Sequence, residues 1–433
     1  MSGEPIFVLF AGMIGLMLLS IPLAFAIFAA STAVLLLYTD LPLWQIMQRF
    51  FSGVDSFVLT AIPFFLLAGN LMNAGKITDK LLDLSSALVG HIRGGLAHIN
   101  IVCSLFFGGI SGSAVADTAG EGSIIIPAMV KAGYAPSFTV AVTVTSSVLG
   151  QIIPPSLIMI VYASTAGVSI QALFLAGILP GILFAVSMMA VSYVYAVRCN
   201  YPKEKRKTFR EILIAVKNAL TVLALPFIIL GGVLSGVFTA TESAAIAVFY
   251  SLIITLFVDK TLTFKDIVPI FIHTAKGTAA TLLCIGAATA FGYLLAYFRG
   301  AEYVLQLLEA MELSQTGFVI FLFVLFTVIG MFMDATPAIC IFVPIIAPVG
   351  MSMGMNGIHM GIIICLVLAF GLVTPPYGLC LLLGCQIAKL PPSTVFRDLV
   401  VFLLGILITL ILIVFIPSFI LWLPGIVVPM ATG

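Results

Sequence analysis

The sequence predicts an all-α polytopic membrane protein that is built from two inverted repeats. Of its 433 residues, 62% are hydrophobic and only 8% are charged, whereas a soluble domain carries about 25% charged residues. The long apolar runs are continuous, which is typical of spanning helices and not of the alternating strands of a membrane barrel. Polar motifs of the first half also recur in the same order in the second half. These observations exclude a soluble protein, a disordered chain and a nucleic-acid binder.

Apolar runs separated by polar residues give the expected helical segments, and about 20 residues per crossing leave room for roughly a dozen of them. In the first half, the runs lie near 5–38, 57–74, 95–110, 123–150, 156–168 and 170–197. In the second half, they lie near 215–236, 242–258, 267–298, 316–332, 338–352, 358–373, 377–388 and 396–424. The first run is too long for the core of a signal peptide and has no basic start, so we expect it to remain as membrane helix.

The densest basic stretch of the chain, from Arg198 to Arg210, separates the two series of runs. Because cytoplasmic loops are enriched in Lys and Arg, we expect this stretch in the cytoplasm. The expected organisation is a first repeat over 1–200, a basic linker over 201–214 and a second repeat over 215–433. A repeat that crosses the membrane an odd number of times must be inverted relative to its partner. Both termini then lie opposite the linker.

Three pairs of motifs indicate an internal duplication. The pairs are Asp117…Pro127 with Asp334…Pro344, at a constant numbering offset of 217; Pro154-Pro155 with Pro375-Pro376, at an offset of 221; and the runs 64–72 with 291–298. Transporters with inverted repeats place their binding sites where the repeats meet, at helices that are broken near the middle of the bilayer. The paired motifs are therefore the candidate site.

Small and hydroxyl residues interrupt an apolar run in the first motif of each half, which would fit re-entrant helical hairpins with polar tips. They leave the backbone free to bend and supply oxygen ligands for a hard cation such as Na⁺. An intramembrane carboxylate in each half also favours function, although glycine and serine can serve close helix packing and each Asp can cap a half-helix. The candidate residues are Ser111, Gly112, Ser113 and Asp117 in the first half and Gly330, Asp334 and Thr336 in the second.

The paired prolines form the second motif. Two adjacent prolines remove two backbone donors and force the preceding residue out of the helical conformation, so the helix must break. Nearby carbonyls then lack helical partners, and a bound Na⁺ would satisfy them; a buried water or a neighbouring side chain is the alternative. The residues concerned are Gly150, Ile153, Pro154 and Pro155 in the first half and Gly371, Thr374, Pro375 and Pro376 in the second.

Arg299 follows the apolar run that ends at Phe298. One interpretation is a side chain that extends to the membrane interface. The other is a guanidinium that binds a substrate carboxylate in a bidentate manner. The predicted substrate-binding residues are Arg299, Asp117, Asp334, Ser113, Pro155 and Pro376.

Five segments together resemble the large membrane subunit (M or DctM type) of tripartite ATP-independent periplasmic (TRAP) transporters, and the resemblance covers nearly the whole chain. The segments are GGISGSAVADTAGEGSIIIPAMVKAGY, GQIIPPS, GVFTATESAAIAV, GMFMDATPAICIFVPI and FGLVTPPYG. The resemblance implies an elevator-type fold with two re-entrant hairpins. It also implies Na⁺-driven uptake of organic acids across the bacterial inner membrane, with both termini periplasmic. The implied partners are a small Q-type membrane subunit, expected as a separate chain, and a periplasmic substrate-binding protein of P type.

The resemblance also places the hairpin-tip residues and the proline breaks in the family's ion and substrate region. The position of Arg299 resembles one proposed to face the carboxylate in relatives that transport sialic acid, so sialic acid is the leading substrate and a C4-dicarboxylate or another carboxylate is the alternative. We expect no cofactor besides Na⁺ as the coupling ion, and no enzymatic activity.

The sequence leaves three other interpretations open. Coupling to protons would use Asp117 or Asp334, but clusters of hydroxyls and carbonyls suit Na⁺ better. An intramembrane aspartyl protease would use the same two carboxylates, yet the GxGD segment of such proteases is missing. A channel also uses broken helices, but a channel rarely needs an inverted duplication with a double-proline break in each half.

Overall fold

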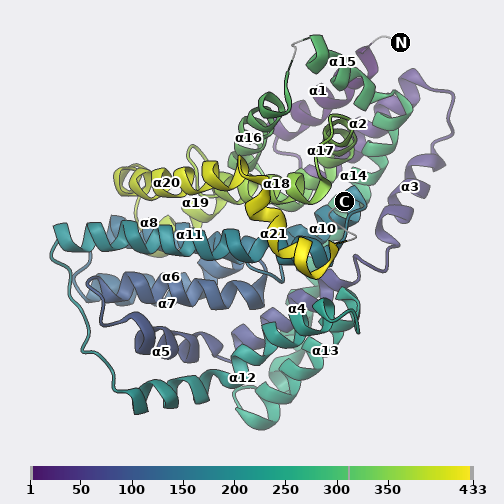
Figure 1. The fold of residues 1–433 in the computed structure, drawn as a ribbon. Coiled ribbons are helices and arrows are strands. Elements are labelled where there is room, and N and C mark those ends of the chain that lie inside the picture. The colour runs from purple at the N-terminus through teal and green to yellow at the C-terminus, as the bar shows by residue number, and fades with distance from the viewer. Residues whose placement is uncertain (1–2, 311–312, 430–433) are drawn as a thin grey trace.

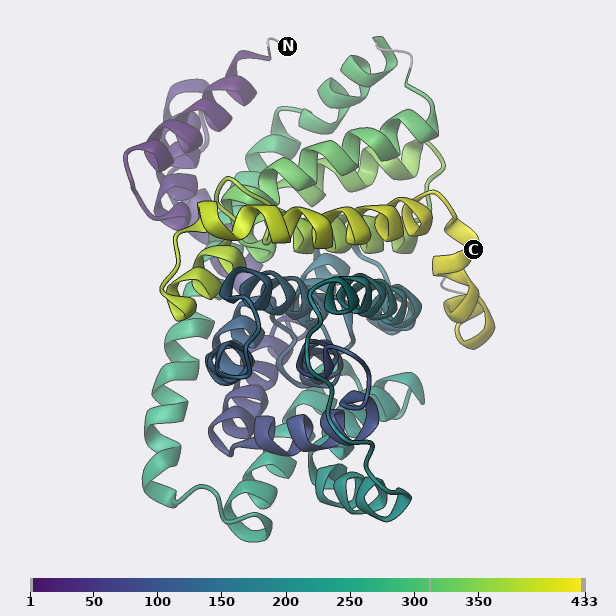
Figure 2. The same cartoon turned by 90° about the vertical axis from the view of Figure 1, so that its left-hand side faces the viewer.

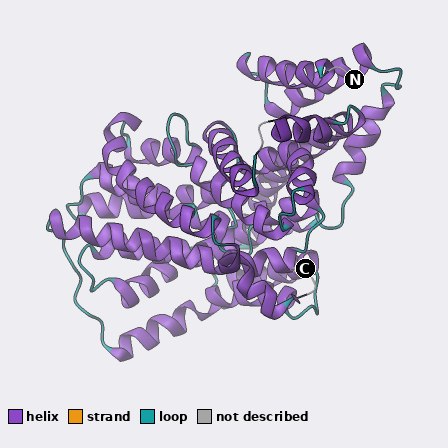
Figure 3. Ribbon diagram, turned by 45° about the horizontal axis from the view of Figure 1, so that its top comes forward, coloured by secondary structure: helices purple, strands orange, loops and turns teal. Residues whose placement is uncertain are grey.

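The computed structural model describes residues 3–310 and 313–429, and within them the chain forms helices and loops without any strand (Figures 1 and 3). The first half contains α1(Glu4–Leu18), α2(Leu23–Tyr38), α3(Trp44–Val54), α4(Ala61–Ala74), α5(Ile77–Val89), α6(Gly95–Ser111), α7(Ala114–Lys131), α8(Pro136–Ser147), α9(Leu149–Ile152), α10(Leu157–Ala166) and α11(Ile170–Arg198). The second half contains α12(Phe209–Leu234), α13(Ala240–Ile253), the π-helical turn η1(Ile254–Val258), α14(Phe264–Tyr297), α15(Gly300–Ala310), α16(Gln315–Phe332), α17(Ala335–Ser352), α18(Gly357–Gly371), α19(Leu379–Ala388), α20(Pro392–Val414) and α21(Pro417–Val427).

Many of these helices suit a membrane. Within the described residues, seven are long and apolar enough to span it, and the bent pair Pro136–Ile152 with Leu157–Ala166 would make an eighth. Seven shorter apolar helices accompany them. The prediction of an all-α polytopic membrane protein is confirmed. The expected run 5–38 forms two helices, and α3 lies in a stretch for which no helix was predicted.

The repeat is visible in the helix boundaries. α7 and α17 both have 18 residues and begin at Ala114 and Ala335, while α8 and α18 begin at Pro136 and Gly357. Both pairs of starting positions show a numbering offset of 221, the same as the proline pairs. The offset of 217 that aligned Asp117 with Asp334 is therefore wrong for the tips. The counterpart of Asp334 is Ser113, because each is the residue that directly precedes a helix.

The two helical hairpins enter from different sides. The start of α6 is tied to the linker, because the Gly94 amide donates to the Pro202 carbonyl (3.1 Å). The base of the α16–α17 hairpin is closed by the Gln315 side chain, which donates to the Met353 carbonyl (2.6 Å). Figure 1 shows this second base beside α15, away from the linker that joins α11 to α12. Their tips point toward each other, as expected for inverted repeats.

The linker is shorter than predicted, because α12 begins at Phe209 and the expected boundary at residue 214 falls inside this helix. Thr208 and Glu211 form a capping box in which the Thr208 amide donates to Glu211 Oε2 (2.6 Å) and the Glu211 amide donates to Thr208 Oγ1 (3.4 Å). This reciprocal pair satisfies two free backbone donors at the helix start and fixes the boundary.

The two sequence halves share one bundle. α14 packs against α2, α3 and α4 of the first half, and α13 packs against α4. Polar contacts also join the two halves: Asn70 of α4 donates to Thr274 Oγ1 of α14 (2.9 Å), and Lys80 of α5 pairs with Asp259, which follows η1 (2.6 Å). In Figure 2, α20 crosses the middle of the molecule between the second hairpin and the helices of the first repeat.

The core lies around α8 and α18. All residues of α18 from Ile358 to Gly371 are buried, as are those of α8 from Phe138 to Ser147. A helix that is apolar on every side belongs in the interior of a bundle. These two repeat-related helices lead directly to the proline breaks. The first break is buried at Pro154 and Pro155, whereas the second is exposed at Pro376 and Tyr377.

Candidate ion and substrate site

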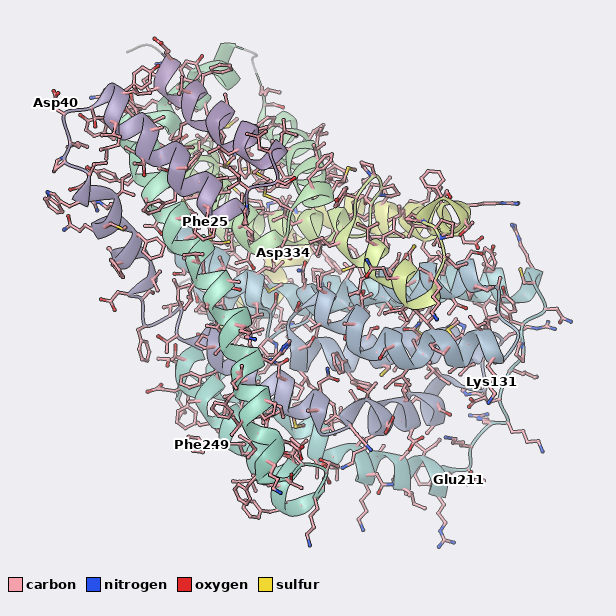
Figure 4. The ribbon with its side chains drawn as sticks, turned by 180° about the vertical axis from the view of Figure 1, so that it is seen from behind. Phe25, Asp40, Lys131, Glu211, Phe249 and Asp334 are labelled. Carbon is pink, nitrogen blue, oxygen red and sulfur yellow. The ribbon has the colours of Figure 1, made fainter. Side chains whose placement is uncertain are left out.

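The tips of the two hairpins face one small cavity of about 110 Å³. Polar residues from four elements reach it, namely Gly112 and Ser113 from the first tip, Asp334 and Thr336 from the second, Gln151 from α9 and Thr281 from α14. Ile62, Leu66, Leu157, Ile158 and Val161 complete its wall. Figure 4 shows Asp334 in the middle of the molecule, far from Lys131 and Glu211 at one side. The structure therefore brings together predicted residues from both halves.

The first tip is a tight turn between α6 and α7. Gly112 adopts a left-handed conformation (φ +62°), and a Cβ at this position would lie 3.0 Å from the Pro155 carbonyl oxygen. Only glycine tolerates both conditions. Ser113 then caps α7, because its hydroxyl accepts a hydrogen bond from the Ala116 amide (3.4 Å). The amide end of α7 thus lies next to the cavity.

The second tip begins its helix at the equivalent position but makes a different turn, because Met333 is extended (φ −138°, ψ 158°) where Gly112 is left-handed. Asp334 occupies the N-cap position of α17 (φ −64°, ψ 153°), although its side chain makes no capping hydrogen bond. Thr336 follows in the first turn and is buried. A carboxylate at a helix N-terminus is favoured by the helix dipole, so the second tip contributes a negative group where the first contributes a hydroxyl.

Each proline break is attached to the tip of its own hairpin. The Leu157 amide donates to the Gly112 carbonyl (3.4 Å), and the Gly378 amide donates to the Met331 carbonyl (3.1 Å). Leu157 and Gly378 are related by the same numbering offset as the proline pairs. One of the carbonyls freed by the first break has a side-chain partner, since Ser156 Oγ donates to the Gln151 carbonyl (2.6 Å). The Gln151 side-chain oxygen is buried, and none of the described residues donates a hydrogen bond to it.

Close backbone packing accounts for several of the predicted glycines. A Cβ on Gly330 would lie 3.1 Å from the Gly371 Cα, and a Cβ on Gly150 would lie 3.1 Å from the Ser113 carbonyl carbon and oxygen. The packing interpretation therefore applies to Gly150, Gly330 and Gly371. An additional role for their carbonyls in ion binding stays a prediction, as does the role of Ile153, Pro154, Thr374 and Pro375.

Asp117 lies outside the wall of the tip cavity, one turn inside α7. It is buried, and neither of its carboxylate oxygens has a hydrogen-bond partner among the described residues. Glu121, one turn further along, is also buried and accepts a hydrogen bond from Ser104 Oγ (2.9 Å). Sequence reasoning missed Glu121, although its spacing of four residues from Asp117 places both on one helix face. A polar network continues from Ser104 through Ser146 to Asn100.

Arg299 is separate from the tip cavity. Its side chain is 69% exposed and pairs with Glu302 at 3.5 Å. It borders a different cavity of about 290 Å³, together with Pro344 and Pro348 of α17. Pro155 and Pro376 are also absent from the wall of the tip cavity. The substrate-binding roles predicted for Arg299, Asp117, Pro155 and Pro376 stay predictions.

Two repeat-related hairpins that meet at a polar cavity inside a multi-span helical bundle define a secondary transporter. The sequence comparison gives the family. A family model described as the tripartite ATP-independent periplasmic transporter, DctM component, matches residues 10–419. The chain belongs to this family of TRAP large permeases and is a transporter component, not an enzyme.

Relatives cover almost the whole chain. The YgiK protein of Salmonella typhimurium is 38% identical over 428 residues, 98% of each chain. The sialic acid TRAP transporter large permease protein of Vibrio cholerae is 34% identical, over 95% of this chain and 97% of its own. The C4-dicarboxylate TRAP transporter large permease protein of Pseudomonas aeruginosa is 35% identical, over 87% and 88%. Near-equal identity to relatives with different substrate names means that identity alone does not select a substrate.

A solved structure shares the fold. The YdaH transporter of Alcanivorax borkumensis superimposes with a TM-score of 0.61 over 86% of this chain and 87% of its own, at 15% sequence identity. This similarity concerns the fold alone.

Proposed function

We propose that this large permease takes up an organic acid anion by coupling its movement to Na⁺. The observation that carries the proposal is the single cavity shared by both tips, with hydroxyl, amide and carboxylate oxygens from Ser113, Gln151, Asp334 and Thr336. Such oxygens are the ligands of hard cations. A volume of about 110 Å³ suits an ion with a few waters, because one water takes up about 30 Å³ in the liquid.

The predicted Na⁺ ligands divide between the repeats. The first repeat would contribute Ser111, Gly112, Ser113, Gly150, Ile153 and Pro154 to Na⁺ binding, and the second repeat Gly330, Asp334, Thr336, Gly371, Thr374 and Pro375. The support for this division is the equivalent N-cap positions of Ser113 and Asp334. Each hairpin is also joined to its own proline break by an amide-to-carbonyl hydrogen bond.

Sialic acid is the leading substrate and a C4-dicarboxylate is the alternative, as the names of the relatives suggest. The transporter would work with a small Q-type subunit and a P-type periplasmic binding protein in the inner membrane of a bacterium. The basic linker would face the cytoplasm and both termini the periplasm. Movement of the hairpins as one body relative to α14, in an elevator-type cycle, would carry the cavity across.

The test is uptake by proteoliposomes that contain this chain with its small subunit, with the binding protein added outside. We expect uptake of radiolabelled sialic acid under an inward Na⁺ gradient and its loss when a Na⁺ ionophore collapses the gradient. Unlabelled succinate and other organic acids, added in excess, would reveal the preferred substrate. Uptake that is unaffected by the ionophore and abolished by a protonophore would refute Na⁺ coupling.

A further inference from the structure

A second and larger cavity of about 440 Å³ adjoins the tip cavity and shares Val161 with it. It lies between α3, α10, α14 and α17. Its volume falls in the range of small-molecule sites, about 300–1,000 Å³, whereas the tip cavity lies below that range. An organic acid of sugar size would therefore fit here and not between the tips.

The described wall of this cavity contains one cation and no acidic residue. Arg49 of α3 stacks on Tyr293 of α14, with its guanidinium carbon 4.1 Å from the centre of the ring. Its Nε atom is buried and has no hydrogen-bond partner within the described part of the chain. Among the described residues the Lys and Arg ion pairs are Lys80 with Asp259 and Arg299 with Glu302, so Arg49 has no carboxylate partner. An unpaired, partly desolvated cation inside a membrane protein is costly and indicates an anionic ligand.

Hydroxyl groups surround this cation on three helices. The wall includes Ser52 of α3, Ser164 and Thr165 of α10, and Thr289 and Tyr293 of α14, with Ser56 just beyond α3. Hydroxyls donate and accept hydrogen bonds, so such a wall suits a ligand with several hydroxyl or carbonyl oxygens. Gly53 seats α3 closely on α14, since a Cβ there would lie 2.2 Å from Thr289 Oγ1. This contact fixes Arg49 against Tyr293.

We propose that this cavity is the substrate site and that Arg49 binds the carboxylate of a polyhydroxylated organic acid, with the rest of the molecule directed toward the hairpin tips. The inference rests on the proposed function and assigns the anionic group to Arg49. A guanidinium held over an aromatic ring keeps its planar fork of donors available for bidentate binding of a carboxylate. Arg299 lies six residues beyond Tyr293 and two residues past the end of α14 at Tyr297.

The test measures sialic acid uptake by the reconstituted complex for Arg49→Gln, Arg49→Lys, Tyr293→Phe and Arg299→Gln. We expect Arg49→Gln to reduce the initial rate at subsaturating substrate by about tenfold or more, in line with the loss of a charged hydrogen bond. Arg49→Lys should give an intermediate loss because it keeps the charge without the planar fork. Tyr293→Phe should give a smaller loss than Arg49→Gln, since it keeps the stacking ring and removes one hydroxyl of the wall. Arg198→Gln, an exposed arginine near the linker, is the matched control and should leave uptake unchanged.

Size-exclusion chromatography establishes that each variant is folded. If Arg49→Gln is not monodisperse, Ser164→Leu narrows the same cavity from α10, and it should also lower uptake severalfold. The inference would be overturned if the wild-type complex transports sialic acid and Arg49→Gln does so with unchanged kinetics. The same holds for Ser164→Leu if that variant replaces Arg49→Gln. Either result would leave the proposed function intact. A loss confined to Arg299→Gln would assign the carboxylate to Arg299 instead. Failure of the wild-type complex to transport any organic acid would refute the proposed function itself.

Discussion

Substituting Gly330 by alanine tests how the second hairpin is held against its broken helix. A Cβ at this position would lie 2.8 Å from the Leu368 carbonyl oxygen and 3.1 Å from the Gly371 Cα. Both atoms belong to the backbone of α18, so no side chain can move aside. Inserting a methyl group into a packed interior costs about 1–3 kcal/mol. Replacing glycine by alanine inside a helix regains about 1 kcal/mol, so we expect a net loss of up to about 2 kcal/mol.

Gly277→Ala is the matched control for this substitution. Gly277 also lies inside a helix, α14, but a Cβ there would meet nothing within 4 Å. The assay is thermal unfolding of the purified complex in detergent, followed by Na⁺-driven uptake. We expect Gly330→Ala to lower the melting temperature by a few degrees and to reduce uptake, whereas Gly277→Ala should equal or exceed the wild type. Equal melting temperatures for both variants would refute the close packing of α16 on α18.

Three further predictions concern other contacts. Asp334→Asn removes the only carboxylate in the described wall of the tip cavity, so it should abolish Na⁺-dependent uptake while leaving the complex monodisperse. It should also abolish the extra thermal stability that the complex has in NaCl compared with KCl. Retained Na⁺ dependence would contradict the assignment. Ser104→Ala should lower the free energy of unfolding by about 1–2 kcal/mol, since it removes the donor to the buried Glu121 carboxylate, and an unchanged melting temperature would argue against this bond. A double-mutant cycle of Lys80→Ala and Asp259→Ala should give a coupling free energy of about 1 kcal/mol in unfolding, because the two side chains are partly exposed at 27% and 14%. If the losses of stability in the two single variants simply add up in the double variant, the ion pair contributes nothing.

The motifs of the site could be predicted from the sequence, but their alignment could not. Pairing Asp117 with Asp334 relied on identical residue types, whereas the fold aligns positions by the start of a helix. Ser113 and Asp334 are equivalent because both residue types suit an N-cap, although only Ser113 makes the capping hydrogen bond. The offset of 221, already present in the proline pairs, was the better guide because those residues impose the helix break directly.

Local signals for two other features were present in the sequence. The order Thr208-Phe-Arg-Glu211 is a capping-box pattern, and it would have placed the start of α12 at Phe209. Glu121 follows Asp117 by four residues, which places both carboxylates on the same face of α7. In both cases the run of apolar residues dominated the interpretation, because hydropathy locates membrane segments well and their ends poorly.

The cavity around Arg49 could not have been predicted from hydropathy. The stretch Trp44–Val54 contains two glutamines, an arginine and a serine, so its mean hydropathy is too low for a membrane segment. Its role depends on contact with α14, whose residue Tyr293 is more than 200 positions away in the sequence. A short amphipathic helix buries one side against a partner that the local sequence does not specify. The paired motifs therefore locate the proposed ion sites, while the substrate site proposed here arises from tertiary packing between an amphipathic helix and a long spanning one.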